Sequence, residues 1–127
     1  MAQPSSPVRT QQFSIDLGGA PAQVVVLGYT DRVMVIVSQA GTLGTVVAAQ
    51  KEAVLGGGST YRVDTVLGSR TDPAAELCGR QLAEGLEGAG CELPLLLCLG
   101  TAPGAGGGAG RAAVRAVVDG VLAHRVW

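Results

Sequence analysis

The sequence has 127 residues, 47% of them apolar, and its 9 basic and 10 acidic residues leave a net charge of -1. This length suggests one globular domain that can bury its own core. The charges are few and scattered, whereas nucleic acid or an anionic membrane requires a clustered basic surface. We therefore expect neither nucleic acid nor a membrane as a partner.

The cysteines and the N-terminus add expectations about compartment and domain limits. Cys78, Cys91 and Cys98 are odd in number and lack C-x-x-C spacing, which is typical of free thiols in a reducing, cytoplasmic compartment. His124 is the only histidine, so no metal site is expected. Residues 1–10 lack the apolar core of a signal peptide and are expected to form a flexible lead before a single domain, residues 11–127.

The first half of the chain predicts a run of strands. Residues 13–17 alternate apolar and polar side chains, and the segments that follow are rich in β-branched residues. Because the connections are short, consecutive strands should pair as a mainly antiparallel meander. The expected strands are 13–17, 22–29, 32–39, 45–50 and 61–67.

After residue 67 the apolar period changes to that of a helix. Asp72 and Pro73 form a helix start, Leu77, Cys78, Leu82 and Leu86 recur at helical spacing, and Gly88 and Gly90 end the helix. A sixth strand, 94–100, and a helix from Arg111 follow. We therefore predict an α+β fold of order βββββαβα, a six-stranded mainly antiparallel sheet with two main helices packed on one face.

Glycines between the third and fourth strands raise the question of a phosphate site. Gly41 and Gly44 follow a buried strand, but they join two strands, and the Lys-Ser/Thr of a P-loop is missing. We interpret them as a structural turn of a hairpin, with the positive φ angles that a short reversal needs.

A second glycine-rich segment, "GAGGGAG" at 104–110, lies between a strand and a helix. Gly104, Gly106 and Ala109 match G-x-G-x-x-A by letter, so a nucleotide-binding enzyme is one hypothesis. A dinucleotide fold also needs a later strand with an acidic residue for the ribose, and none follows here. We therefore expect no nucleotide, no cofactor and no catalytic residue.

The strand at 33–37 is apolar on both faces. Val33, Val35 and Val37 point one way, and Met34 and Ile36 point the other. Two helices cover only one face of a sheet, so a partner chain should cover the second. The predicted dimer interface is Val33, Val35, Ile36 and Val37, with the parity that meets the partner left open. The alternative is that loops and the N-terminal lead cover this face.

The segment "AQVVVLGYTDRVMVIVSQAGTLGTVV" resembles the core of the third proteasome assembly chaperone family. The shared pattern falls on residues 23–25 and then on Val35, Val37, Ser38, Gln39, Gly41, Gly44 and Thr45. The "VLG" at 66–68, the Asp-Pro helix start and the last helix ending in Val126 and Trp127 also fit. The resemblance covers about residues 11 to 127, and none of these motifs is catalytic.

This resemblance implies a chaperone without enzymatic activity. Members of the family have a six-stranded antiparallel sheet with helices, and they pair with a related small protein, the fourth proteasome assembly chaperone, or self-associate as homodimers. The pair binds alpha subunits during assembly of the 20S core particle. The loop before the last helix is usually charged in relatives, but here it is "GAGGGAG". A roadblock- or longin-type scaffold subunit is the runner-up, although five strands before any helix count against it.

Overall fold

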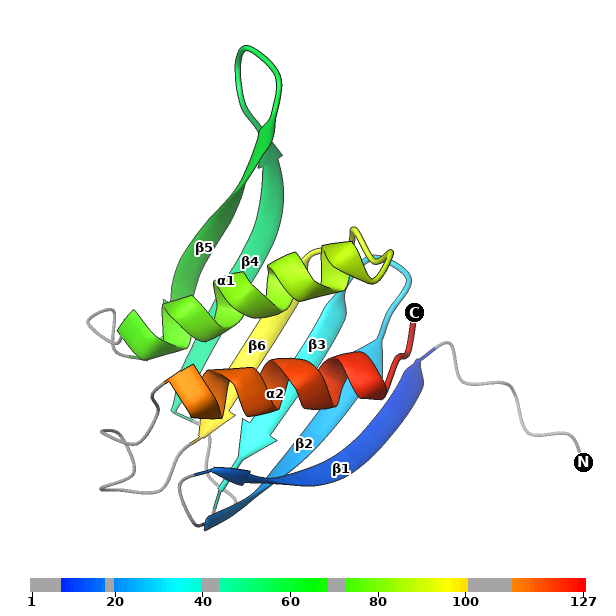
Figure 1. Ribbon diagram of the computed structural model, residues 1–127, viewed down its shortest axis with the longest axis vertical. Coiled ribbons are helices and arrows are strands. Elements are labelled where there is room, and N and C mark those ends of the chain that lie inside the picture. Colours follow the sequence, from blue (N-terminus) through cyan, green and yellow to red (C-terminus); the bar gives the residue numbers. More distant parts are fainter. Residues whose placement is uncertain (1–7, 18–19, 40–43, 69–72, 101–110) are drawn as a thin grey trace, which may run out of the picture.

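A computed structural model describes residues 8–17, 20–39, 44–68, 73–100 and 111–127. The elements follow the predicted order βββββαβα, and the sheet is mixed but mostly antiparallel, so the predicted α+β fold is confirmed. Figure 1 shows both helices lying across one face of the sheet. The elements are β1 (Arg9–Leu17), β2 (Ala20–Gly28), β3 (Val33–Ser38), β4 (Thr45–Ala53), β5 (Ser59–Leu67), α1 (Pro73–Gly88), β6 (Leu95–Gly100) and α2 (Arg111–Ala123).

The strand order across the sheet is β1-β2-β3-β6-β4-β5. β6 lies between β3 and β4, parallel to the first and antiparallel to the second. The predicted hairpin between the third and fourth strands is therefore wrong. These strands do follow each other in sequence, but the apolar strand β6 arrives later and occupies the position between them.

Several strands are longer than the sequence pattern predicts. β1 begins at Arg9, opposite Gly28, four residues before the alternation that starts at Phe13. Residues 9–12 are polar and exposed, so they carry no apolar period, although the backbone ladder with β2 holds them in the sheet. Pairing with a neighbour therefore extends a strand beyond the residues that bury a side chain.

The core lies between the sheet and the helix layer. Its largest fully buried side chains come from one face of the central strands and from the inner stripes of the helices. Cys78, Leu82 and Leu86 of α1 are buried as predicted, but Leu77 is 41% exposed and does not belong to the stripe. The fully buried set is Leu82, Leu86, Leu97, Val24, Val26, Val33, Val35, Val37, Val47 and Val121.

The end of α1 follows the glycine signal in the sequence. Gly90 has a φ of 90°, and its N–H donates to the carbonyl of Glu87 at 3.0 Å. The N–H of Cys91 donates to the carbonyl of Leu86 at 2.8 Å, which completes a Schellman motif. Pro73 is the first residue of α1, and the expected cap, Asp72, lies outside the described residues.

The last residues of the chain, which follow α2, contact both the end of α1 and the sheet. The Trp127 indole N–H donates to the carbonyl of Ala89 at 3.2 Å, just after α1. Val126 is 5% exposed and packs so closely on β2 that a Cβ at Gly28 would lie 2.8 Å from it. Only glycine leaves room for this contact, because part of the obstruction is the backbone carbonyl of Val126.

We predict that Gly28→Ala lowers the free energy of unfolding by about 1 to 3 kcal/mol, because the added methyl overpacks the contact with Val126. Gly44→Ala is the matched control, since a Cβ at Gly44 meets nothing within 4 Å. The control should stay within about 0.5 kcal/mol of the unmodified chain. Chemical denaturation of both variants measures the difference, and equal stabilities would contradict the prediction.

Candidate protein–protein interface

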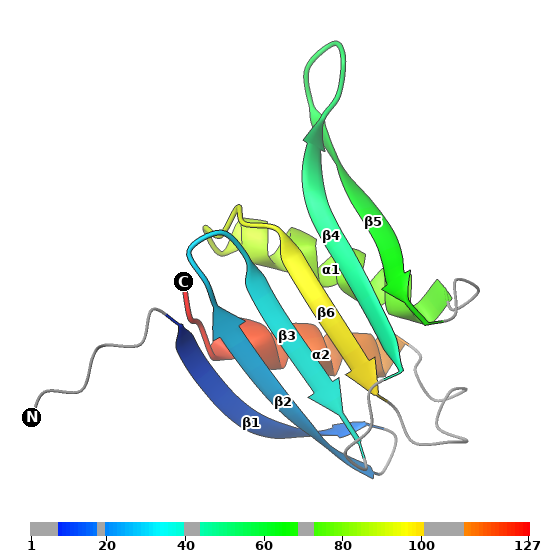
Figure 2. The ribbon, with the colours of Figure 1, turned by 180° about the vertical axis from the view of Figure 1, so that it is seen from behind.

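The candidate site is the face of the sheet that points away from the helices, seen in Figure 2. The strand register aligns apolar side chains on this face in two rows across β2, β3, β6 and β4. Most of them are half-buried by their neighbours, and Cys98 is buried. We call them the apolar face: Val25, Ile36, Cys98 and Val46 in one row, and Leu27, Met34, Leu96 and Ala48 in the other.

Within the described ranges, no helix or strand lies over the apolar face (Figure 2). The helices α1 and α2 both pack on the opposite side of the sheet (Figure 1). Soluble monomers rarely leave a contiguous apolar surface of this kind in contact with water. The face therefore has the character of a protein–protein contact surface.

Polar residues surround the apolar face. Thr10 and Gln12 of β1 continue the two rows at one edge of the sheet. Ser14, Gln23 and Ser38 lie next to the row that contains Val25 and Ile36. The other end is bordered by Gln50, Arg62 and Asp64. An apolar centre inside a polar rim is the usual anatomy of a protein interface.

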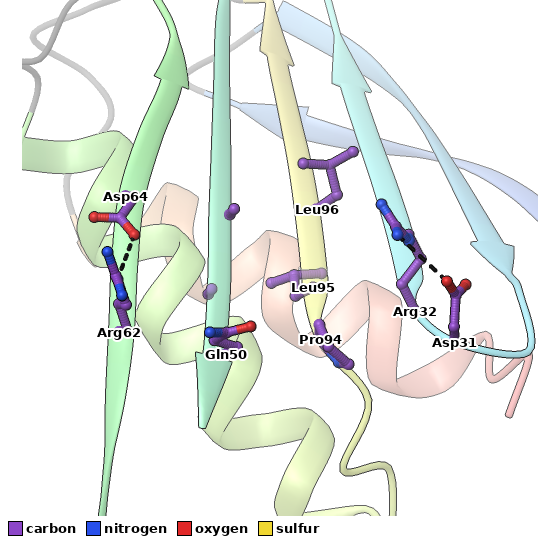
Figure 3. Close-up of a pocket in the computed structure, with 10 residues that line it drawn as sticks. Asp31, Arg32, Gln50, Arg62, Asp64, Pro94, Leu95 and Leu96 are labelled. Atoms are coloured by element: carbon purple, nitrogen blue, oxygen red, sulfur yellow. Dashed lines mark hydrogen bonds and ion pairs between the residues drawn. The ribbon is translucent and has the colours of Figure 1, made fainter. Parts of the chain in front are cut away.

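A hollow of about 310 Å³ lies at this last border. Figure 3 shows its floor, made by Leu95 and Leu96 of β6, and its walls, which carry charged side chains from both sides. Arg32 pairs with Asp31 at 3.3 Å, and Arg62 with Asp64 at 2.8 Å. The hydrogen bond that Arg62 donates to Asp64, and then the charge of that carboxylate, raise the pKa of Arg62. Each guanidinium thus has a carboxylate partner, and the hollow is electrically balanced.

The structure corrects most of the interface residues expected from the sequence. Val33, Val35 and Val37 are 0%, 0% and 1% exposed beneath the helices, so they cannot meet a partner. Ile36 alone of the predicted residues lies on the apolar face. The pattern could not distinguish the faces, because both parities of this strand are apolar and only the placement of the helices separates them.

Of the two glycines in the predicted structural turn, Gly41 and Gly44, the structure describes only Gly44. Gly44 is exposed, it has no left-handed φ, and its N–H donates to the carbonyl of Leu99 at 2.9 Å. It therefore leads into β4 beside β6 and is not a hairpin glycine, which corrects that part of the prediction. Gly41 lies outside the described residues, as do Gly104, Gly106 and Ala109 of the glycine-rich segment.

The three cysteine thiols and the imidazole of His124 pack against other parts of the fold. All three cysteines are free and buried. Burial raises the pKa of Cys78 to about 12 and also raises the pKa of Cys98, which makes both thiols poor nucleophiles. His124 stacks on Phe13 with ring centroids 4.0 Å apart, and its Nδ1–H donates to the carbonyl of Gly120 at 2.8 Å. This contact places the imidazole at the C-terminal end of α2.

Among the described residues, no group of histidine, cysteine and carboxylate side chains is arranged to hold a metal ion. No described helix is long and apolar enough to cross a membrane.

The second exposed apolar feature is the β4–β5 hairpin, which extends past the rest of the sheet in Figure 1. At its tip Val54 is 46% exposed and Leu55 is 100% exposed. Lys51 and Tyr61, at its base, both bind the carboxylate of Glu87 on α1. The hydrogen bond that Lys51 donates to Glu87 raises the pKa of Lys51. The base is thus tied to the helix layer while the tip stands free. Sequence reasoning missed this tip, because a loop residue carries no period.

Comparison with known proteins relates this chain to a known family. The sequence model of the family described as "Proteasome assembly chaperone 3" matches residues 35–121. The chain belongs to this family. The matched segment begins in β3 and runs into α2, so it includes β6 and the β4–β5 hairpin, whereas β1 and β2 precede it. The resemblance read from the sequence is therefore confirmed.

A solved structure has the same fold as this member of the proteasome assembly chaperone 3 family. It is a chain of a crystal structure described as a novel chaperone complex for yeast 20S proteasome assembly. The TM-score is 0.60 at 14% identity, with 88% of this chain and 96% of that chain covered. At this identity the likeness supports the fold alone. None of the curated protein sequences matches the chain.

We predict that Cys78 resists alkylation in the folded chain. With a pKa of about 12, only about one thiol in ten thousand is ionised at pH 8. Iodoacetamide labelling followed by peptide mass spectrometry should therefore modify Cys78 only after denaturant is added. Rapid labelling of Cys78 in the native chain would show that this part of α1 opens.

Proposed function

We propose that this chain is a non-enzymatic, cytoplasmic chaperone that pairs through its apolar face with the fourth proteasome assembly chaperone. The pair then binds alpha subunits during assembly of the 20S core particle. Membership of the proteasome assembly chaperone 3 family supports the general role. The single observation that carries the pairing is the apolar face, which is contiguous and has no described element over it.

The composition of the apolar face fits a partner that also presents an apolar sheet. Its centre holds aliphatic side chains and one thiol, and the neighbouring arginines are paired with aspartates of the same chain. Association would bury apolar area without leaving a charge unpaired, which is the favourable case for an interface core. A second copy of the chain satisfies the same conditions, so a homodimer in the absence of the fourth chaperone is part of the proposal.

We predict that Ile36→Asp abolishes pairing, because the carboxylate would be buried without a partner at the centre of the interface. The expected loss is about 3 to 5 kcal/mol of binding free energy. Gln81→Asp adds the same charge to an exposed position of α1, in the opposite layer, and serves as the control. Isothermal titration with the fourth chaperone, and analytical ultracentrifugation of the chain alone, measure the effect.

The choice of control makes the outcome specific. If Gln81→Asp and Ile36→Asp both pair like the unmodified chain, the apolar face is not the pairing surface. If both variants lose pairing, net charge rather than position decides, and the proposal also fails. Equal melting temperatures of the two variants show that each is folded.

A chaperone that holds both a partner and an alpha subunit needs a second contact surface. The tip of the β4–β5 hairpin fits this need, because Leu55 is fully exposed and the hairpin extends past the rest of the sheet (Figure 1). The tip remains accessible when the face is covered. We assign it to the alpha-subunit contact.

We predict that Leu55→Ser weakens capture of alpha subunits and leaves pairing unchanged. Loss of a leucine from an apolar contact costs about 1.5 to 3 kcal/mol if the contact buries it fully. Thr60→Ala, on the same hairpin but without an apolar side chain, is the control. Pull-down of recombinant alpha subunits by the assembled pair measures the effect, and undiminished capture by Leu55→Ser would remove the tip from the proposal.

A further inference from the structure

Both rows of the apolar face reach the edge strands. The row of Leu27 and Met34 ends on Thr10 and Asp64, both polar, whereas the two ends of the row that contains Ile36 differ from each other. Strand pairing continues the row beyond Val25 to Gln12 on β1, and beyond Val46 to Leu67 on β5. At the β1 edge the row ends on an amide, whereas at the β5 edge it ends on a leucine. The full row is Gln12, Val25, Ile36, Cys98, Val46 and Leu67.

An irregularity in the β4–β5 ladder places Leu67 in this row. Thr65 is opposite Val47, but the next pair is Leu67 with Val46, so Val66 is an extra residue. In a regular ladder Val66 would oppose Val46 and Leu67 would turn toward the helices. The bulge reverses this alternation and brings Leu67 to the same side as Val46.

The residue after Leu67 holds the chain in this path. Gly68 has a φ of 101°, and a Cβ at this position would collide with the backbone carbonyl of Gly44. The close approach of these two backbones fixes the end of β5 against the start of β4. The placement of Leu67 is therefore determined by the packed backbone on both sides of it.

The exposure of this strand end is unusual for a sheet edge. Val66 is 62% exposed and Leu67 is 65% exposed, although β5 is an edge strand. Edge strands of soluble proteins are normally protected by polar or charged side chains. Arg62 and Asp64, earlier in β5, follow that rule, and so do Thr10, Gln12 and Ser14 of the other edge strand.

We infer that the pairing surface is displaced from the centre of the sheet: it crosses β4, continues over Val66 and Leu67 of β5, and stops short of β1. This inference rests on the pairing proposed above. The occupant is the apolar sheet face of the paired small chaperone. A strand added to the β5 edge is disfavoured, because the bulge at Val66 interrupts the backbone groups that such a strand would use.

The two ends of the row provide a matched pair of variants. Leu67→Glu and Gln12→Glu place the same charge at the two edges of one row, and both positions are exposed. We expect Leu67→Glu to raise the dissociation constant for the fourth chaperone at least about tenfold, because it places a carboxylate within the contact. Gln12→Glu should change it less than about threefold, as rim positions do. Isothermal titration measures both constants.

A second pair, Leu67→Lys and Gln12→Lys, separates position from the sign of the charge. If Leu67→Lys also raises the dissociation constant more than Gln12→Lys does, the displaced surface is supported. If the order of the two positions inverts with the sign of the charge, the partner's electrostatic field determines the effect, and the inference is overturned. If Leu67→Glu lowers the melting temperature, the uncharged Leu67→Gln replaces it. That variant should still weaken pairing more than Gln12→Glu does.

The Ile36→Asp variant distinguishes failure of this inference from failure of the proposed function. If Ile36→Asp loses pairing while the Leu67 variants pair normally, the surface is centred and only the displacement is wrong. If the Gln12 variants weaken pairing as much as the Leu67 variants do, the surface spans both edges and the displacement is again wrong. If Ile36→Asp pairs normally, both the inference and the pairing through the apolar face fall.

Discussion

The parallel pairing of β3 with β6 is the constraint on which the rest of the molecule depends. β6 joins two separate units, the β1-β2-β3 meander and the β4–β5 hairpin, and without it neither unit forms a sheet wide enough for two helices. A strand in this position is covered by the helices on one side and forms the middle of the apolar face on the other. Its sequence, Leu95 to Leu99, is correspondingly apolar throughout. The apolar face and the core thus share the same central strand.

Much of the fold could be predicted from local patterns. The alternation at 13–17, the helical spacing from Cys78 to Leu86 and the glycines after it are properties of short segments, and the structure contains each of these elements. The order of the strands in the sheet, in contrast, is not a property of short segments. Whether residues 33–38 pair with residues 45–53 or with residues 95–100 depends on contacts between distant parts of the chain. The short connection between β3 and β4 favours direct pairing of these two strands, but in the structure β6 lies between them.

The interface was harder to predict than the fold, for a reason visible in β3 and β5. A doubly apolar strand indicates that both faces are covered, but it contains no information on which face carries the helices. The sequence prediction therefore includes Val33, Val35 and Val37, which the helices bury, together with Ile36. The bulge at Val66 breaks the period on which such reasoning rests. Leu67 therefore reads as a core-facing residue in the sequence, although the structure exposes it beside Val46.

The position of Trp127 has a practical consequence. It is the only tryptophan in the sequence, and its indole binds the end of α1 in the helix layer, on the side of the sheet opposite the apolar face. Its fluorescence should respond when the helices leave the sheet. Covering the apolar face leaves the indole's surroundings as they are. Intrinsic fluorescence thus reports the integrity of one layer, independently of any event at the other, and it does so without a label.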